Sequence, residues 1–124
     1  MPNKFPVESI PDAAHLYRRI LQKHYKNNDI EPAAFVLAGG MSCDWKEYFT
    51  AQQSIDRVEN KKVRFAGVVY FVCGKLRFEY FDVRHTPSDN NKAHCTVSAE
   101  DSEENRIKLT RLYEKDWALK LASS

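Results

Sequence analysis

The stretch that decides the fold is residues 63–84, VRFAGVVYFVCGKLRFEYFDVR. Residues 63–72 are rich in β-branched and aromatic side chains, which indicates a strand buried on both faces. Gly74 supplies the positive φ of a tight turn, and from Leu76 onward apolar and charged side chains alternate, as in a strand with one solvated face. We therefore predict a β-hairpin over residues 63–84.

Two longer helices are expected before and after this hairpin. Leu16 and Ile20, with their apolar neighbours, follow the i, i+3, i+4 spacing of an amphipathic helix over residues 11–26, and a proline fits its first turn. The second helix is expected near the end of the chain. Acidic residues gather at its start, around residues 100–104, and basic residues such as Arg111 follow. This is the charge order that a helix dipole favours. This pattern predicts a helix over residues 102–121, with Trp117 on its inward face.

Two shorter elements complete the expected fold. Thr50 and Gln53 have the spacing of a capping box, which predicts a short helix ending near Val58. Residues 93–98 alternate apolar and polar side chains, which predicts a third strand. The sequence has neither an internal repeat nor a linker, so we expect one α+β domain over residues 1–124. Its small antiparallel sheet, made of the hairpin and the third strand, is packed by the two longer helices.

The composition narrows the class of protein. The chain has 124 residues, of which 43% are hydrophobic and 12% aromatic, which is enough for a core and too apolar for a disordered chain. The longest apolar run has eight residues, so the sequence predicts no membrane-spanning helix, and its first residues lack the apolar segment of a secretory signal. An odd number of cysteines without such a signal indicates reduced thiols, and we expect a cytoplasmic protein.

The small net charge of +2 hides an uneven distribution. Residues 1–28 carry +3 and residues 61–98 carry +4, whereas residues 29–60 carry −4. A nucleic-acid-binding module usually has one concentrated basic face, so nucleic acid is an open partner but not the favoured one. The chain has only four glycines, which leaves little room for a phosphate-cradling loop. This argues against nucleotide hydrolases and dinucleotide-dependent oxidoreductases, and we expect no cofactor.

The best candidates for catalytic residues frame a polar loop. His85, Asn91 and His94 lie at its two ends, and two imidazoles beside an amide could serve as general acid, general base and oxyanion ligand. With an arginine nearby the same set would suit a phosphodiester, because guanidinium presents a fork to phosphate oxygens. The structural alternative is that Asn91 caps a turn and that both histidines fill strand ends.

We do not expect a metal site. Cys43, Asp44, His85, His94 and Cys95 are suitable ligand types, but metal ligands usually occur as closely spaced pairs. His94 and Cys95 are adjacent, so on a strand their side chains point to opposite faces. Joint ligation by these two residues is therefore unfavourable.

Two further pairs of residues are candidates for ligand binding. Arg18 and Arg19 could contact RNA or a nucleotide phosphate, although only one of two adjacent helical residues faces a given site. The alternative is solvated charge, or pairing with Asp44 or Asp56. Asp44 and Trp45 could hold a base or a sugar, the ring by stacking and the carboxylate by accepting a hydrogen bond. In the alternative, Trp45 packs onto the sheet and Asp44 caps a turn.

Several short motifs occur in an order that resembles a known group of proteins. The motifs are Arg18-Arg19, Ala33-Ala34-Phe35, Ser42-x-Asp44 and Asn91-x-Ala93-His94. Their order, over about residues 16–98, resembles that of a group of small uncharacterised bacterial proteins. The group tends to have serine before Ala-Ala-Phe, where this chain has Glu31-Pro32, and proline where this chain has Lys92. The resemblance implies a bacterial, cytoplasmic protein and no particular reaction.

Two hypotheses of function follow from these residues. The first is a binding or protein-interaction module, with a homodimer or another protein as partner; it predicts that no concave pocket collects the polar residues. The second is a small hydrolase-like or nucleotide- or RNA-binding enzyme, in which the arginines, Asp44, Asn91 and the two histidines converge in one cleft. If His85 and His94 lie on opposite sides of the structure, the enzyme hypothesis fails.

Overall fold

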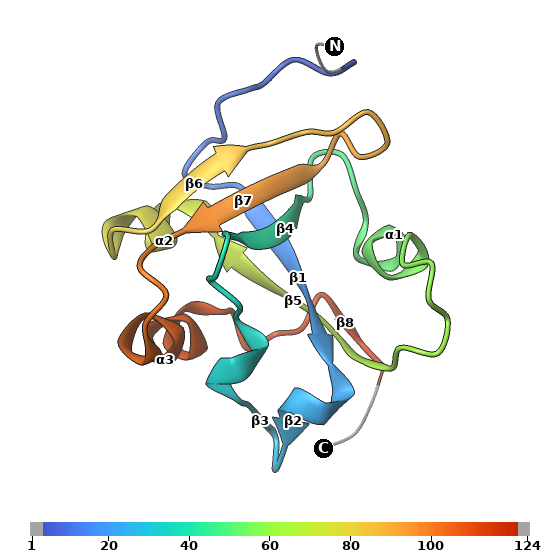
Figure 1. Ribbon diagram of the computed structural model, residues 1–124, viewed down its shortest axis with the longest axis vertical. Helices are drawn as coiled ribbons and strands as arrows, with labels where there is room; N and C mark the ends of the chain where they lie inside the picture. Colours follow the sequence, from blue (N-terminus) through green and yellow to red (C-terminus); the bar gives the residue numbers. More distant parts are fainter. Residues whose placement is uncertain (1–3, 122–124) are drawn as a thin grey trace.

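A six-stranded antiparallel sheet organises residues 4–121, the part of the chain that the computed structural model describes (Figure 1). In spatial order its strands are β6 (Asp82–His85), β7 (His94–Ser98), β4 (Met41–Trp45), β1 (His15–Leu21), β5 (Phe65–Val72) and β8 (Leu119–Lys120). The α-helices are α1 (Ala51–Asp56), α2 (Cys73–Phe78) and α3 (Glu103–Leu112). Two 3-10 turns, η1 (Gln22–His24) and η2 (Pro32–Ala34), flank a ribbon of β2 (Tyr25–Lys26) and β3 (Asp29–Ile30).

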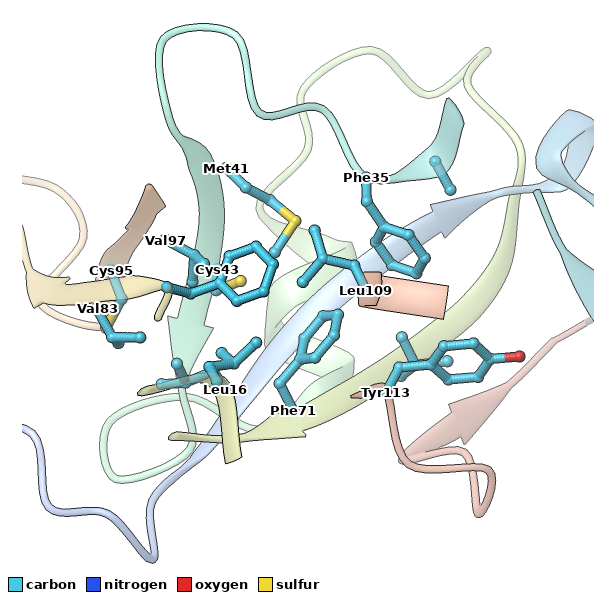
Figure 2. Close-up of a cluster of buried hydrophobic side chains, with 14 of the residues drawn as sticks. Leu16, Phe35, Met41, Cys43, Phe71, Val83, Cys95, Val97, Leu109 and Tyr113 are labelled. Atoms are coloured by element: carbon cyan, nitrogen blue, oxygen red, sulfur yellow. The ribbon is translucent and has the colours of Figure 1, made fainter. Parts of the chain in front are cut away.

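One face of the sheet, which we call the core face, is covered by α2, α3 and the η2 segment. Leu16 of β1 lies opposite Phe71 of β5, and both belong to one hydrophobic cluster with Leu76 of α2 and Leu109 of α3. Phe35, which follows η2, meets Phe71 edge to face with ring centroids 5.6 Å apart (Figure 2). All five side chains are completely buried. Burial of this apolar surface is the main source of stability for the fold.

The other face, which we call the open face, carries the side chains that alternate with those of the core. Tyr17 lies beside Asp44, and Asp44 beside His94, across β1, β4 and β7. Helix α1 packs here, because the Ser54 hydroxyl donates a hydrogen bond to Asp44 at 2.7 Å. Figure 1 shows α1 on the other side of the molecule from α2 and α3. The open face therefore carries polar side chains, and α1 is the helix that packs on it.

The predicted fold class, α+β with an antiparallel sheet, is confirmed, and so are two of its elements. Strand β7 covers residues 94–98 of the predicted 93–98. The Thr50 hydroxyl accepts from the Gln53 N–H at 3.1 Å, and the Gln53 side chain accepts from the Thr50 N–H at 2.8 Å. This is the predicted capping box, and it begins α1.

The helix predicted over residues 11–26 is wrong, because residues 15–21 form β1 and the residues after them form η1 and β2. Leu16 and Ile20 satisfy helical spacing and also a strand period of two, and the charged Arg18 between them obscured the strand pattern. Arg18 is tolerated on the core side because its guanidinium donates to two backbone carbonyls, at 2.9 and 3.0 Å. Pairing with β4 and β5 outweighs the local helical preference.

The hairpin predicted over residues 63–84 is correct only for its first strand, β5. The predicted turn at Cys73 to Lys75 begins α2, and β6 pairs with β7 instead of with β5. Strand β5 has no edge for a hairpin partner, because β1 lies along one side and β8 along the other. Gly74 is needed for close approach, since a Cβ there would lie 2.9 Å from the Cβ of Asp12.

The helix predicted over residues 102–121 ends early, with α3. Tyr113 leaves the helical conformation, with φ −67° and ψ 144°, and the chain then runs beside β5. The N–H groups of Glu114 and Ala118 donate to carbonyls of β5 at 2.8 and 3.0 Å. Trp117, expected on the helix, packs edge to face on an aromatic ring of β2, with centroids 5.0 Å apart. Covering the exposed edge of β5 outweighs further helical turns.

Strands β1 and β4 are paired over a short length, and this positions the site described below. Their register joins Leu16 with Trp45 and Tyr17 with Asp44. Beyond these pairs β1 continues along β5 without β4 beside it. The guanidinium of Arg18 lies where β1 and β4 move apart, since it donates to a carbonyl of β4 at 3.0 Å. The sheet thus contains a polar opening between two of its central strands.

Candidate functional site

A polar pocket opens where β1 and β4 separate. Its volume is about 280 Å³, and its lining includes Arg18 and Arg19 of β1, Asp44 of β4, Arg57 after α1 and His94 of β7. We call it the arginine pocket. Four of these five residues were singled out from the sequence, and the fold brings them together from three strands.

Asp44 holds the floor of this pocket together. It is 5% exposed, and its Oδ2 accepts from the Ser54 hydroxyl at 2.7 Å while its Oδ1 accepts from the Asn91 amide at 3.1 Å. The guanidinium of Arg19 lies 3.7 Å from the same carboxylate. Asp44 therefore connects α1, the loop between β6 and β7, and β1, and the pairing of Arg19 with Asp44 is one of the predicted alternatives.

Arg18 bridges two backbone segments beside the pocket. Its Nη1 donates to the Ser42 carbonyl at 3.0 Å and its Nη2 to the Ala34 carbonyl at 2.9 Å. Its Nε is buried and makes no hydrogen bond to any residue between 4 and 121. Burial lowers the pKa of the Arg18 guanidinium. Removing this charged group from water is therefore unfavourable for the free energy of folding.

Arg19 has a quarter of its side chain exposed. Its Nη1 donates to the Ser54 carbonyl at 2.9 Å. Burial lowers the pKa of Arg19, the Asp44 carboxylate opposes this shift, and repulsion from Arg57 and Arg18 adds to it. The Arg19 guanidinium is therefore close enough to Arg18 and Arg57 to be repelled by both, and the Asp44 carboxylate offsets this repulsion.

His94 contributes an imidazole with both ring nitrogens engaged. Its Nε2 lies 3.1 Å from the Ser42 hydroxyl, and its Nδ1 lies 3.0 Å from the Thr86 carbonyl oxygen. The Thr86 hydroxyl is also within 2.9 Å of Nδ1. His94 is half-buried and Ser42 is exposed. The hydrogen bonds fix the ring orientation while leaving the hydroxyl of Ser42 open to solvent.

His85 does not belong to this site. It lies opposite Cys95 across β6 and β7, so it points to the core face, whereas His94 points to the open face. It is 2% exposed; its Nδ1 accepts from the Glu8 N–H at 2.9 Å and its Nε2 donates to the Lys92 carbonyl at 2.7 Å. The predicted catalytic set of two histidines and one asparagine therefore does not assemble.

Asn91 acts through Asp44 instead of lining the pocket. It is 1% exposed, its amide nitrogen donates to Asp44, and its Oδ1 accepts from the Ala93 N–H at 3.0 Å. The second contact caps a turn of the loop, as the structural alternative proposed, and both histidines do lie at strand ends. Asn91 thus positions the carboxylate that pairs with Arg19.

Trp45 is also outside the arginine pocket. It follows Asp44 on β4, so its side chain lies on the core face, where it is 6% exposed. Its ring meets those of Tyr48 and His85 edge to face, with centroids 5.2 and 5.3 Å apart. The alternative expectation, that Trp45 packs onto the sheet, describes its position.

Two pocket residues were missed at the level of sequence. Ser42 precedes Asp44 by two positions, which places both on one face if residues 41–45 form a strand. That strand was not predicted, so the signal was overlooked. Arg57 follows the short helix α1 and has no distinguishing motif. It reaches the pocket because Ser54 anchors α1 on Asp44.

A second, larger depression continues the positive charge of the arginine pocket. Its volume is about 620 Å³, and Lys23, Lys62 and Arg64 line it. Leu21 lines both depressions. The backbone of Arg64 accepts a hydrogen bond from the Gln22 N–H at 3.0 Å. The two basic segments of the sequence therefore meet in space, at the end of β1.

The cysteines and the remaining potential metal ligands are not arranged as a site. All three cysteines are buried and free. Burial raises the pKa of Cys43 to about 12, and it also raises the pKa of Cys73 and Cys95. Within residues 4–121, no three His, Cys, Asp or Glu side chains are grouped so that they could hold a metal ion.

Comparison of the chain with protein-family models, with curated proteins and with solved structures finds no match in any of the three. The role of the arginine pocket therefore has to be inferred from its own chemistry.

Proposed function

We propose that the protein is a binding module for a small anionic molecule whose phosphate or carboxylate group enters the arginine pocket. The observation that carries this proposal is the gathering of Arg18, Arg19 and Arg57 around one opening, where Asp44 is the one acidic residue among the described residues that line it. Guanidinium groups present paired donors in a plane, which matches the oxygens of phosphate and carboxylate groups.

The energetics of the pocket support an anion. Burial lowers the pKa of Arg18 and Arg19, and the neighbouring guanidiniums lower that of Arg19 further. These shifts mean that both guanidinium groups are partly desolvated and that Arg19 is repelled by its two arginine neighbours. A bound anion would relieve the repulsion and accept hydrogen bonds in a partly desolvated site, where such bonds are strong.

The neighbouring basic depression supports a ligand with more than one negative group. Lys23, Lys62 and Arg64 line it, and no acidic residue of the described chain does. A molecule with one anionic group in the arginine pocket could extend a second toward these cations. A pyrophosphate or a nucleotide carries more than one negative group, and the summed positive potential of the two depressions would also speed its association.

The geometry also favours a small ligand over the protein or nucleic-acid partners considered from the sequence. A protein-interaction module would not require a pocket that collects the polar residues, and such a pocket is present. The enzyme built on His85, Asn91 and His94 required these side chains to converge, and His85 lies on the other face.

We further propose that the protein works in the bacterial cytoplasm. Support for the compartment comes from the three buried free cysteines, since thiols persist where the environment is reducing. Support for the bacterial source comes from the motif order in residues 16–98. Among the helices of residues 4–121, none has the length and apolar content to cross a membrane.

Calorimetric titration with inorganic phosphate, pyrophosphate and succinate tests the anion-binding role. We expect pyrophosphate to bind, and Arg19→Gln and Arg57→Gln each to weaken binding by about tenfold or more. Arg57 is exposed, so its variant should fold normally.

The matched control is Arg84→Gln, which removes an arginine of β6 that is ion-paired with Asp82 at 2.8 Å, outside the pocket. This variant should bind like the unmodified protein. If none of the three anions binds, or if Arg84→Gln weakens binding as much as Arg19→Gln, the proposed function is wrong.

A further inference from the structure

Ser42 and His94 form a hydrogen-bonded pair at the mouth of the arginine pocket. Ser42 lies on β4 and His94 on β7, and because His94 is opposite Asp44 the two side chains are diagonal neighbours on the open face. The Ser42 Oγ is 3.1 Å from the His94 Nε2, and both residues line the pocket. A hydroxyl and an imidazole at this distance have the geometry of a nucleophile and its base.

The partners of His94 determine which nitrogen carries the proton. The Thr86 carbonyl oxygen, 3.0 Å from Nδ1, can only accept, so Nδ1 must be protonated and must donate. Nε2 then has a free lone pair and accepts the proton of the Ser42 hydroxyl. The Thr86 hydroxyl can accept from Nδ1 as well and donate to Thr96, 2.7 Å away. A backbone carbonyl here holds the tautomer that a carboxylate holds in a catalytic triad.

Positive charge lies next to the backbone of Ser42. The Arg18 Nη1 donates to the carbonyl of Ser42 itself at 3.0 Å, and Arg19 lines the same pocket. Fixed cations beside a nucleophile stabilise the negative charge that develops on a substrate oxygen in an addition step. The same cations would attract a substrate with an acidic group.

Three cysteines and two serines of the described chain are other potential nucleophiles, and they lack these features. Cys43, Cys73 and Cys95 are buried, so they are not accessible to a substrate. Ser54 is 1% exposed and its hydroxyl donates to Asp44. Ser88 is exposed, but its hydroxyl donates to Asn90 and not to an imidazole. Ser42 combines exposure, a base and adjacent positive charge.

We infer that Ser42 is a nucleophile and His94 its general base in the hydrolysis of a small ester that carries a phosphate or carboxylate group. The expected preference for an acidic substrate rests on the proposed function, whereas the reactivity of Ser42 does not. His85 takes no part, so this site differs from the one expected from the sequence.

The reaction proceeds in two balanced halves with water as the second substrate. The Ser42 Oγ forms a bond to the ester carbonyl carbon as its proton moves to the His94 Nε2; the bond from that carbon to the leaving alkoxide then breaks, and His94 returns the proton to the alkoxide. In the second half water attacks the acyl group on Ser42 and gives a proton to His94. The acyl bond to Oγ breaks, and Oγ takes that proton, which restores the enzyme.

Labelling with an alkyl fluorophosphonate, mapped by peptide mass spectrometry, tests the nucleophile in the unmodified protein. We expect phosphonylation of Ser42 and not of the exposed Ser88, which serves as the internal control. The His94→Gln variant should slow the labelling of Ser42 by about 100-fold, because glutamine cannot take up the proton.

Turnover of 4-nitrophenyl hydrogen succinate against 4-nitrophenyl acetate tests the substrate class. The protein should hydrolyse the anionic ester faster, Arg19→Gln should remove the preference, and Ser42→Ala should remove turnover. Equal labelling of Ser42 and Ser88, or labelling that is unchanged in His94→Gln, would overturn the nucleophile even if pyrophosphate binds. Labelling of Ser42 by a protein that binds no anion would instead overturn the proposed function and leave the nucleophile standing.

Discussion

His85 and His94 stand at the facing ends of neighbouring strands, and the sheet sends them to opposite environments. His85 lies on the core face, where a backbone N–H and a backbone carbonyl saturate its ring and Trp45 packs on it. His94 lies on the open face, where one nitrogen contacts a backbone carbonyl and the other contacts an exposed hydroxyl. The same side chain thus stabilises the core in one case and offers a base to solvent in the other.

The difference shows what a histidine needs in order to be chemically useful in this fold. Both rings have their orientation and tautomer fixed by backbone groups, so rigidity does not distinguish them. They differ in the group that contacts the unprotonated ring nitrogen. For His85 this group is the backbone N–H of Glu8, and for His94 it is the hydroxyl of Ser42 in the arginine pocket. The predictions below test whether the core face provides stability and the open face provides reactivity.

The largest effect is expected on the core face, from Phe35→Ala. Phe35 is completely buried and meets Phe71 edge to face, with Tyr113 as a further neighbour. Removing the ring leaves a cavity, and the free energy of unfolding should fall by about 3–5 kcal/mol. Urea unfolding measures the loss. The adjacent Val36 is 50% exposed, so Val36→Ala should change stability by less than about 0.5 kcal/mol.

The two histidines give the most direct test of the comparison. His85→Ala removes a ring that fills the space beside Trp45 and leaves the Glu8 N–H and the Lys92 carbonyl without their partner. We expect a loss of about 2–4 kcal/mol in the free energy of unfolding. His94→Ala should cost about 1 kcal/mol or less, because water can replace its contacts. Equal losses in the two variants, measured by urea unfolding, would contradict the contrast between the faces.

A smaller loss is expected from Asp44→Ala, which tests a buried group of the open face. The substitution leaves the Ser54 hydroxyl and the Asn91 amide without an acceptor and removes the charge beside Arg19. These effects together should lower the free energy of unfolding by about 2–3 kcal/mol. Asp56 is an exposed carboxylate of α1, so Asp56→Ala should cost about 0.5 kcal/mol. A stable Asp44→Ala protein would mean that this carboxylate does not hold α1 on the sheet.

The segments whose secondary structure was predicted wrongly share one physical cause of the error. Leu16 and Ile20 fit a helix and a strand equally well, and the choice was made by β4 and β5, which lie 20 or more positions away in the chain. Likewise, residues 73–85 would form the second half of a hairpin if β5 had a free edge. Elements with a local cause, such as the capping box at Thr50, were predictable. Segments whose local pattern fits both a helix and a strand were decided by distant strands, and these were not predictable.

The candidate site also has a part that the sequence could predict and a part that it could not. Arg18, Arg19, Asp44 and His94 could be singled out because charged and imidazole side chains are the usual carriers of binding and catalysis. Which histidine shares their face depends on the register between β6, β7 and β4, and no short motif encodes that register. A shift of one position exchanges the faces, so the residue types were predictable and their grouping was not.

The smallest effect concerns the core-face thiols at alkaline pH. Burial raises the pKa of Cys43 to about 12 from an ordinary value near 9.0. A raised pKa means that the folded chain holds this proton more tightly than the unfolded chain does. The contribution of the thiol to the free energy of unfolding is therefore complete below about pH 9, and it is lost as the pH rises toward 12. Between pH 8 and pH 10 the free energy of unfolding should therefore fall by about 1 kcal/mol through this thiol.

Urea unfolding of the unmodified protein and of Cys43→Ala at these two pH values isolates the contribution of this thiol. Cys95, which lies opposite Cys43 on β7 and whose pKa burial also raises, stays in both proteins, so its contribution cancels in the comparison. The variant should lose less stability between the two pH values by the amount given above, whatever its stability at pH 8. An identical loss in both proteins would mean that the thiol of Cys43 reaches water in the folded state, and that the core face is less closed than its contacts imply.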